Sequence, residues 1–222
     1  MTILSKDPFG ILESTSNFRL EVQMHLQSED DVNKTVFSFR QASLCQLLIN
    51  YTPNLNHSSC LKGFIYDILN SVVAIIKKRE RYLQLNFRSM VEHIARLSLD
   101  KSYNGGEFDL TVRTKDFIHL KQTVQDENWS YLHNVYINAC HYVHSSPEAN
   151  LNFAAKFISL MTGDCNSTQG NMVKNLFKVV SELMRIIIKH YHIHISDIFY
   201  RNAKDLEKIM GKSLHKHYLT YF

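Results

Sequence analysis

Glycine and proline are scarce in this chain of 222 residues, which contains 7 glycines and 3 prolines. All-β folds need many of both residues for their frequent turns, so the scarcity argues against a sandwich or barrel and favours helices. Hydrophobic residues make up 45% and charged residues 21% of the chain, as is ordinary for a soluble globular protein. A chain of this length buries roughly 70% of its unfolded surface, so a stable core needs no metal or disulfide.

Paired cysteines and nucleotide-binding loops are also lacking. None of the four cysteines belongs to a C-x-x-C pair: Cys45, Cys60, Cys140 and Cys165. Zinc-finger spacing and a disulfide framework are therefore unsupported, and we expect free thiols in a reducing cytosol. The sequence has no G-x-x-x-x-G-K-[ST], G-x-G-x-x-G or G-x-S-x-G motif, so ATPase, dinucleotide-dependent oxidoreductase and α/β-hydrolase activities lack support, and we expect no cofactor.

Long hydrophobic runs are missing as well. The most apolar segment, FIYDILNSVVAII, has 13 residues and is interrupted by Asp67 and Asn70, whereas a membrane-spanning helix needs about 20 apolar residues. The first residues, MTILSKDPFG, do not form the basic and apolar regions of a signal peptide. We therefore expect a cytoplasmic protein that does not bind a membrane.

What the sequence does contain is helical periodicity along nearly its whole length. Ser28, followed by Asp31, is typical of a helix start, Pro53 interrupts a helix, and Ser146 with Pro147 starts another. The expected helices cover about 9–27, 29–50, 59–78, 80–99 (separate from or continuous with the previous one), 114–123, 127–145, 147–163, 170–191 and 194–211, followed by a polar and aromatic tail.

One irregular excursion interrupts this pattern at about 101–113. The residues Asn104, Gly105 and Gly106 predict a turn, and the alternating Phe108, Leu110 and Val112 that follow indicate a short strand or an extended loop. The sequence therefore predicts an all-α multi-helix bundle, one domain over 1–222, with this single excursion.

The segment RSMVEHIAR, residues 88–96, contains the first candidate site. An apolar stripe with helical spacing predicts the buried face of this helix: Phe87, Met90, Val91, Ile94 and Leu97. On another face, Arg88, Glu92 and Arg96 follow one another at intervals of four residues. One interpretation is a surface ladder of ion pairs, each contributing about 0.2–0.5 kcal/mol.

Arg88 and His93 also match R-x4-H, the short form of the R-x4-6-H motif, and a second element, YINACHYVHSS, follows two helices later. On these elements and its helical pattern the chain resembles the HEPN superfamily over about 60–160, with the N- and C-terminal helices packed on that core. These small all-α domains are widespread in bacterial toxin–antitoxin and phage-defence systems, and many are metal-independent endoribonucleases. The family's Arg is often followed by Asn, whereas Ser89 stands here.

The resemblance implies a role for each residue of the motif. Cleavage of RNA by its 2′-hydroxyl needs a proton acceptor, a proton donor and positive charge on the phosphate. By analogy His93 would transfer protons, Arg88 would bind the phosphate with its planar fork, and Glu92 would orient either one.

The spacing of Arg88 and His93 leaves three arrangements open, because five residues of a helix place the two side chains about 140° apart. The helix is distorted, or a second subunit completes the site, or the partner of Arg88 is another histidine. His141 and His144 are the alternatives, near a helix C-terminus that favours their protonated forms. They either cap backbone carbonyls or face Arg88 and Glu92 across a groove between helices.

A basic run precedes the motif. Lys77, Lys78, Arg79 and Arg81 form either a solvated helix surface or a track for an RNA backbone leading to Arg88. The net charge of +4 is well below that of a dedicated duplex-DNA-binding protein.

A second histidine cluster, KHYHIHISD, is a candidate metal site. His190 and His194 would share one helix face, but no H-E-x-x-H pattern and no third ligand accompany them, so chance enrichment is the favoured interpretation and we expect no metal.

These observations lead to two hypotheses of different classes. The first is a HEPN-like metal-independent endoribonuclease of a bacterial defence or toxin–antitoxin system, acting on RNA as a homodimer and associated with an antitoxin or defence protein. The second is a non-catalytic helical interaction subunit or regulator of such a system. A metal-dependent phosphohydrolase ranks third, because the sequence offers no convergent set of Asp and His ligands.

Overall fold

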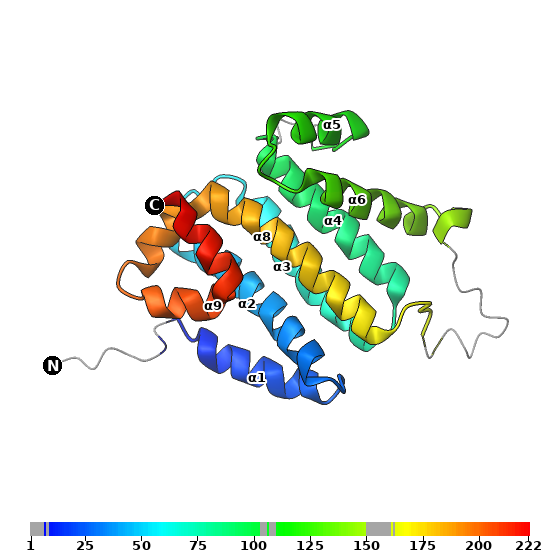
Figure 1. Cartoon of the computed structure of the whole chain (residues 1–222), viewed down its shortest axis with the longest axis horizontal. Coiled ribbons are helices and arrows are strands. Elements are labelled where there is room, and N and C mark those ends of the chain that lie inside the picture. The colour runs from blue at the N-terminus through cyan, green and yellow to red at the C-terminus, as the bar shows by residue number, and fades with distance from the viewer. Residues whose placement is uncertain (1–6, 8, 103–105, 107–109, 150–160, 162) are drawn as a thin grey trace.

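The structure is a computed structural model that describes residues 7, 9–102, 106, 110–149, 161 and 163–222, and within them it contains helices and no strand (Figure 1). The predicted all-α bundle is therefore confirmed. The α-helices are α1 (Ile11–Gln23), α2 (Glu29–Tyr51), α3 (Ser58–Ile76), α4 (Glu80–Ser98), α5 (Thr114–Thr123), α6 (Trp129–Val143), α8 (Gln169–Phe199) and α9 (Ala203–Tyr218), with 3-10 turns at Pro147–Ala149 and Leu219–Tyr221.

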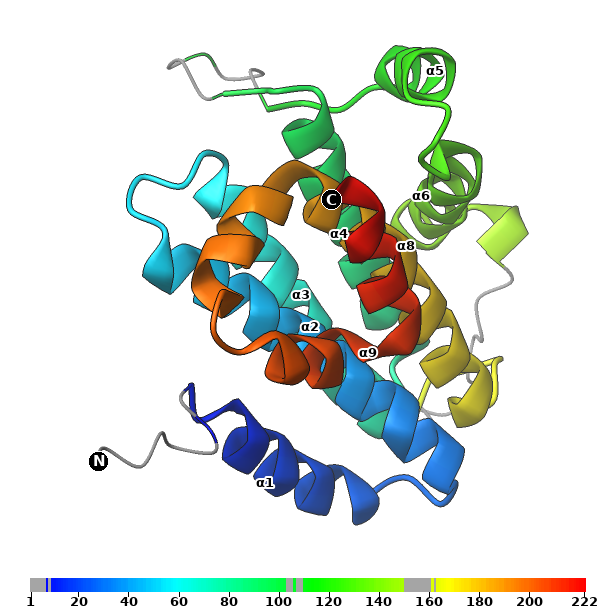
Figure 2. The ribbon, with the colours of Figure 1, turned by 60° about the vertical axis from the view of Figure 1, so that its left-hand side comes forward.

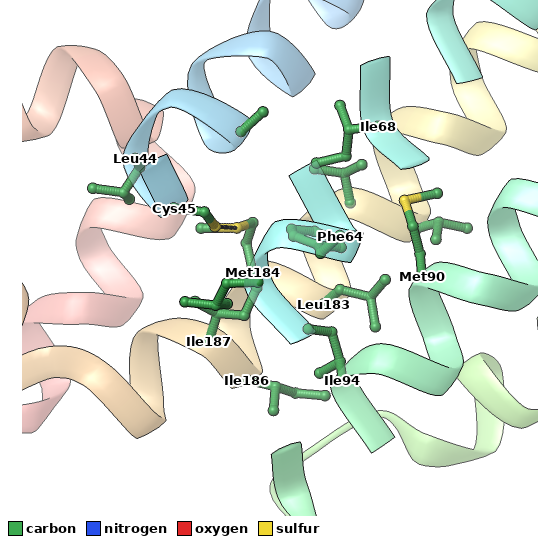
Figure 3. Packing of buried hydrophobic residues seen from close by; sticks show 14 of the residues in the cluster. Leu44, Cys45, Phe64, Ile68, Met90, Ile94, Leu183, Met184, Ile186 and Ile187 are labelled. Carbon is green, nitrogen blue, oxygen red and sulfur yellow. Dashed lines mark hydrogen bonds between the residues drawn. The ribbon is translucent and has the colours of Figure 1, made fainter. Parts of the chain in front are cut away.

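The four helices α2, α3, α4 and α8 pack against one another and enclose the core. Helices α1 and α9 cover α2 on one side of the molecule, and on the other side α6 covers α4 while α5 packs on α6 (Figures 1 and 2). Figure 3 shows the centre, where Phe64 of α3 lies among apolar side chains of the other three central helices. The labelled neighbours are Leu44, Cys45, Ile68, Met90, Ile94, Leu183, Met184, Ile186 and Ile187.

Most helix starts and ends follow the local sequence. The Asp31 amide donates to Ser28 Oγ, so Ser28 caps α2 as predicted, and α2 ends two residues before Pro53. Helices α3 and α4 are separate, because the backbone turns at Lys78, which has φ +51°.

The last two helices agree in part with the sequence prediction. The helix predicted to end near residue 191 has a break there, because Tyr191 (φ −118°, ψ 17°) is not helical, but a further helical segment follows directly and α8 runs on to Phe199. No Gly or Pro stands at that point to stop it, and the buried Tyr191 donates from its hydroxyl to the Asn56 carbonyl at 2.6 Å. Gly211, at the predicted end of the last helix, is likewise not helical (φ +75°, ψ 159°), and a further helical segment follows it to Tyr218.

Two predicted segments lie partly outside the described residues. In the excursion at 101–113, the described residues 101–102, 106 and 110–113 form no strand, while 103–105 and 107–109 are outside them. Of the helix expected at 147–163, the described part includes the 3-10 turn Pro147–Ala149, and 150–160 and 162 are outside.

Helix α3 is longer than its apolar run suggested. It has 19 residues with a mean hydropathy of 1.5, and by length and composition alone it would suffice to cross a membrane. The expectation that this segment is too short is therefore wrong. Half of its apolar segment is buried against other helices, as in the core helix of a bundle. A single helix of this kind is therefore weak evidence for a membrane-spanning segment.

The start of α4 is tied to the loop that precedes α8. The Glu80 amide donates to Asp164 Oδ1 at 2.8 Å. In return the buried Glu80 carboxylate accepts from the amides of Asn166 and Ser167, at 2.8 and 3.1 Å, and from the Ser167 hydroxyl. This reciprocal pairing fixes the loop against the α3–α4 turn and thereby positions the first turn of α4.

We predict that Glu80→Ala lowers the free energy of unfolding by about 2–4 kcal/mol, because it leaves buried donors without an acceptor. Urea denaturation followed by circular dichroism measures the change. Glu207→Ala, an exposed carboxylate on α9, is the matched control and should stay within about 0.5 kcal/mol of wild type. A loss in Glu80→Ala as small as that of the control would contradict the proposed pairing.

Candidate functional site

The candidate site lies on the outward face of α4, between α3 and α6 (Figure 1). Helices α4 and α6 run antiparallel, since Arg81 Nη2 donates to the Val143 carbonyl at 3.3 Å and the Arg88 guanidinium lies 5.7 Å from the ring centre of Tyr136. On its other side, α4 places His93 beside Asp67 of α3. The motif residues therefore contact two different neighbouring helices.

Arg88 is held by Glu92 and Tyr136. Its Nε donates to Glu92 Oε1 at 3.1 Å, and its side chain is 29% exposed. Burial opposes the charged form, but the Glu92 carboxylate and Tyr136 outweigh burial and raise the pKa of Arg88. The guanidinium is therefore a permanent, partly accessible cation.

Glu92 joins Arg88 to Arg96. Its second carboxylate oxygen, Oε2, accepts from Arg96 Nη2 at 3.2 Å. Arg96 is further fixed by a 2.7 Å hydrogen bond from its Nε to the Leu110 carbonyl. The ladder of ion pairs predicted from the spacing is thus present. Its members are only 17–29% exposed, so it is more enclosed than a solvated helix surface.

His93 has partners at both ring nitrogens. Its Nδ1 lies 3.4 Å from Arg96 Nη1, and its Nε2 lies 3.3 Å from Ser89 Oγ and 3.5 Å from Asp67 Oδ2. Because a guanidinium only donates, Nδ1 is assigned as the acceptor and Nε2 as the protonated nitrogen. Burial, and after it the charge of Arg96, lowers the pKa of His93 to about 4, so the imidazole is neutral at pH 7.

Asp67 is the residue that sequence reasoning missed. It is 7% exposed, and burial raises the pKa of its carboxyl to about 6. The available indication was an acidic residue in the middle of the most apolar helix. Gly63 lies one turn earlier, where an added Cβ would come within 2.2 Å of His93 Nε2. The missing side chain of Gly63 makes room for the imidazole next to Asp67.

The structure does not bring His141 and His144 to Arg88 within one chain. Because Arg88 is level with Tyr136, His144 is about 12 Å further along α6 at 1.5 Å per residue. His144 is exposed at the C-cap of α6, and His141 Nδ1 lies 2.9 Å from Ser146 Oγ. The arrangement with these histidines facing Arg88 and Glu92 is therefore not found.

The basic run surrounds the α3–α4 turn. Lys77, Lys78 and Arg81 are exposed, and Arg79 is half-buried. Arg81 precedes Arg88 by seven residues, about 10 Å along the same side of α4. Arg81 and Arg88 thus lie along one flank of α4, the flank that faces α6.

His190 and His194 flank the kink of α8 and line a cavity of about 450 Å³ that His57 and Asp100 also line. His57 Nε2 pairs with Asp100 Oδ1 at 2.7 Å. Among the described residues, no three His, Cys, Asp or Glu side chains come together in an arrangement that could hold a metal ion.

No protein-family model, curated protein or solved structure matches this chain. The assignment of a function therefore depends on the motif and on the geometry described above.

The Asp67–His93 pair contributes opposing pH dependences to stability. Between about pH 4 and 6 the folded state keeps a proton on Asp67 that the unfolded state has lost, so this group lowers stability as pH rises. Between about pH 4 and 6.5 the unfolded state binds a proton on His93 that the folded state lacks, so this group raises stability as pH rises.

We predict that Asp67→Asn leaves only the His93 contribution of the pair. The free energy of unfolding should then rise from about pH 4.5 to 6 more steeply than in wild type, by on the order of 1 kcal/mol per pH unit. His93→Gln should change the slope in the opposite direction. Urea titrations at a series of pH values test both, with the exposed Asp197→Asn as the control. Parallel profiles for all four proteins would refute the assignment.

Proposed function

We propose that this protein is a HEPN-like metal-independent endoribonuclease of a bacterial defence or toxin–antitoxin system, acting on RNA in the cytoplasm. The observation that supports this best is the connected array on α4, in which the partly exposed Arg88 is linked through Glu92 and Arg96 to His93. Lys77, Lys78, Arg79 and Arg81 would guide the RNA backbone toward this array.

In this proposal Arg88 binds the phosphate of the scissile bond. Glu92 holds the Nε edge of the guanidinium, so the two terminal amino groups can bind two phosphate oxygens without loss of that contact. The charge they supply stabilises the phosphate as it becomes more anionic during attack.

His93 would transfer the proton. Its Nδ1 contact with Arg96 is long, at 3.4 Å, and a phosphate that attracts the Arg96 guanidinium would free the Nδ1 lone pair. Nδ1 then accepts the proton of the 2′-hydroxyl while the 2′-oxygen bonds to phosphorus. As the bond to the 5′-oxygen breaks, the proton returns to that oxygen, and the products are a 2′,3′-cyclic phosphate and a 5′-hydroxyl. The ionised Asp67 beside Nε2 would stabilise the intervening imidazolium.

A homodimer would solve the geometric problem of this pair. Arg88 approaches α6 and His93 approaches α3, so one phosphate contacts both most readily when Arg88 of one copy and His93 of another meet. His144 lies about 12 Å along α6 from the level of Arg88, so it would take part through a second copy.

A specific observation supports the second candidate, a non-catalytic helical interaction subunit or regulator of such a system. Both nitrogens of His93 already have partners inside the chain, as expected of a structural histidine. This function would retain binding of RNA by the basic residues without cleavage.

We predict that Arg88→Ala reduces cleavage of a labelled single-stranded RNA by at least about 100-fold, the usual effect of removing a charge-stabilising group. Arg88→Lys should retain part of the activity, because it keeps the charge without the planar fork. The exposed Arg201→Ala is the control and should cleave like wild type. Thermal unfolding must show that each variant is folded. Undiminished cleavage in folded Arg88→Ala would refute the endoribonuclease proposal, and RNA binding without cleavage in wild type would favour the regulator.

We predict that mixing inactive Arg88→Ala and His93→Ala chains restores about a quarter of wild-type activity. Half of the dimers in an equal mixture are mixed, and each mixed dimer would contain one intact pair out of two. Activity of the mixture is measured after subunit exchange, and each variant alone is the control. If both residues act within one chain, no mixed dimer contains an intact site and the mixture stays inactive.

A further inference from the structure

The surface where α3 and α4 meet near their connecting turn exposes apolar side chains. Val73 of α3 and Tyr82 and Leu85 of α4 are 54%, 62% and 46% exposed. Val73 and Tyr82 line one hollow of about 270 Å³, and Tyr82 and Leu85 line a second hollow of about 270 Å³ together with Val143. We call these four residues and the two hollows the α3–α4 surface.

The apolar residues of this surface are contiguous. Tyr82 lines both hollows, so it connects Val73 in the first hollow with Leu85 and Val143 in the second. Isolated apolar residues are normal on protein surfaces, whereas a contiguous apolar set is typical of a binding site.

Positive charge borders the same surface. Lys77 and Arg79 line the first hollow, and Arg81 lines the second. The carboxylate of Glu80 does not offset the charges of Lys77 and Arg81 at the surface, because it is buried and accepts hydrogen bonds from the loop before α8. A partner of complementary chemistry therefore has apolar side chains flanked by acidic ones.

We propose that the α3–α4 surface binds an amphipathic helix of a partner protein. Two apolar side chains one helical turn apart would enter the hollows on either side of Tyr82, and flanking Asp or Glu residues would face Lys77 and Arg81. This inference goes beyond the proposed ribonuclease activity and does not require it, because binding here uses neither Arg88 nor His93.

Three other occupants fit the surface less well. An RNA backbone would use the cations but gain little from Val73, Leu85 and Val143. A lipid surface would contact protruding side chains and leave the hollows unfilled. A two-fold pairing of this chain would bring the same positively charged surface against itself.

The test uses a fluorescein-labelled 18-residue peptide with Leu at helical i, i+4 positions and Glu on the flanks. Fluorescence anisotropy should show binding to the wild-type chain, and Leu85→Glu should weaken binding at least about tenfold because it places a charge in the second hollow. The control is Leu20→Glu on α1, on the far side of the bundle, which should bind like wild type. Circular dichroism establishes that both variants are folded.

Several outcomes would overturn the proposal. They are no binding of the peptide to wild type, equal binding of a peptide with Lys in place of Glu, or equal binding to Leu85→Glu. Displacement of the peptide by a 20-nucleotide RNA that binds Leu85→Glu as well as wild type would assign the surface to RNA. Binding of phosphatidylglycerol vesicles in place of the peptide would assign it to lipid. A dimer in light scattering that Leu85→Glu converts to monomers would assign it to a second copy. None of these measurements reads RNA cleavage, so the two proposals fail separately.

Discussion

The close approach of α4 to α3 at Gly63 is the constraint on which the candidate site depends. The His93 imidazole occupies the space that any side chain at position 63 would fill. In this space the imidazole lies against Asp67 and Ser89. Arg88 and Glu92 lie on the adjacent face of α4. A bulkier residue at position 63 would push α3 and α4 apart and would thereby disturb every contact of the array described above.

Charges of alternating sign run across α4 from Arg88 through Glu92 to Arg96, and the neutral His93 connects Arg96 to Asp67. In water such pairs contribute little, but partial burial reduces screening and makes each charge dependent on its neighbours. Burial also raises the pKa of Asp67 and lowers the pKa of His93, so it favours the neutral form of each. An array of this kind serves either to activate a proton-transferring group or to fix the packing of α4. In the first role a phosphate would draw Arg96 away from His93 Nδ1, and in the second role Arg96 would keep that contact.

Local sequence determined most of the fold, and long-range contacts determined the rest. Helix α2 begins after Ser28, which caps it, and ends before Pro53, which cannot continue it, and both effects can be predicted from the residue types alone. The hydrogen bond of the Tyr191 hydroxyl to the carbonyl of Asn56, 135 residues earlier, is instead a long-range contact that periodicity cannot reveal. The same division applies to the site. The pairing of Arg88 with Glu92 followed from a spacing of four residues, whereas Asp67 and Tyr136 come from other helices, and only the packing of α3 and α6 against α4 places them there.

The reciprocal pairing of Glu80 with the loop before α8 has a consequence for local opening of the molecule. The amides of Asn166 and Ser167 lie outside any helix, yet both donate to a buried carboxylate. Their exchange with deuterated solvent requires that the loop detach from the first turn of α4, so they should exchange in concert with each other and with that turn. The boundary between slowly and rapidly exchanging backbone in this part of the chain is thus set by one glutamate, and it does not coincide with the end of a helix.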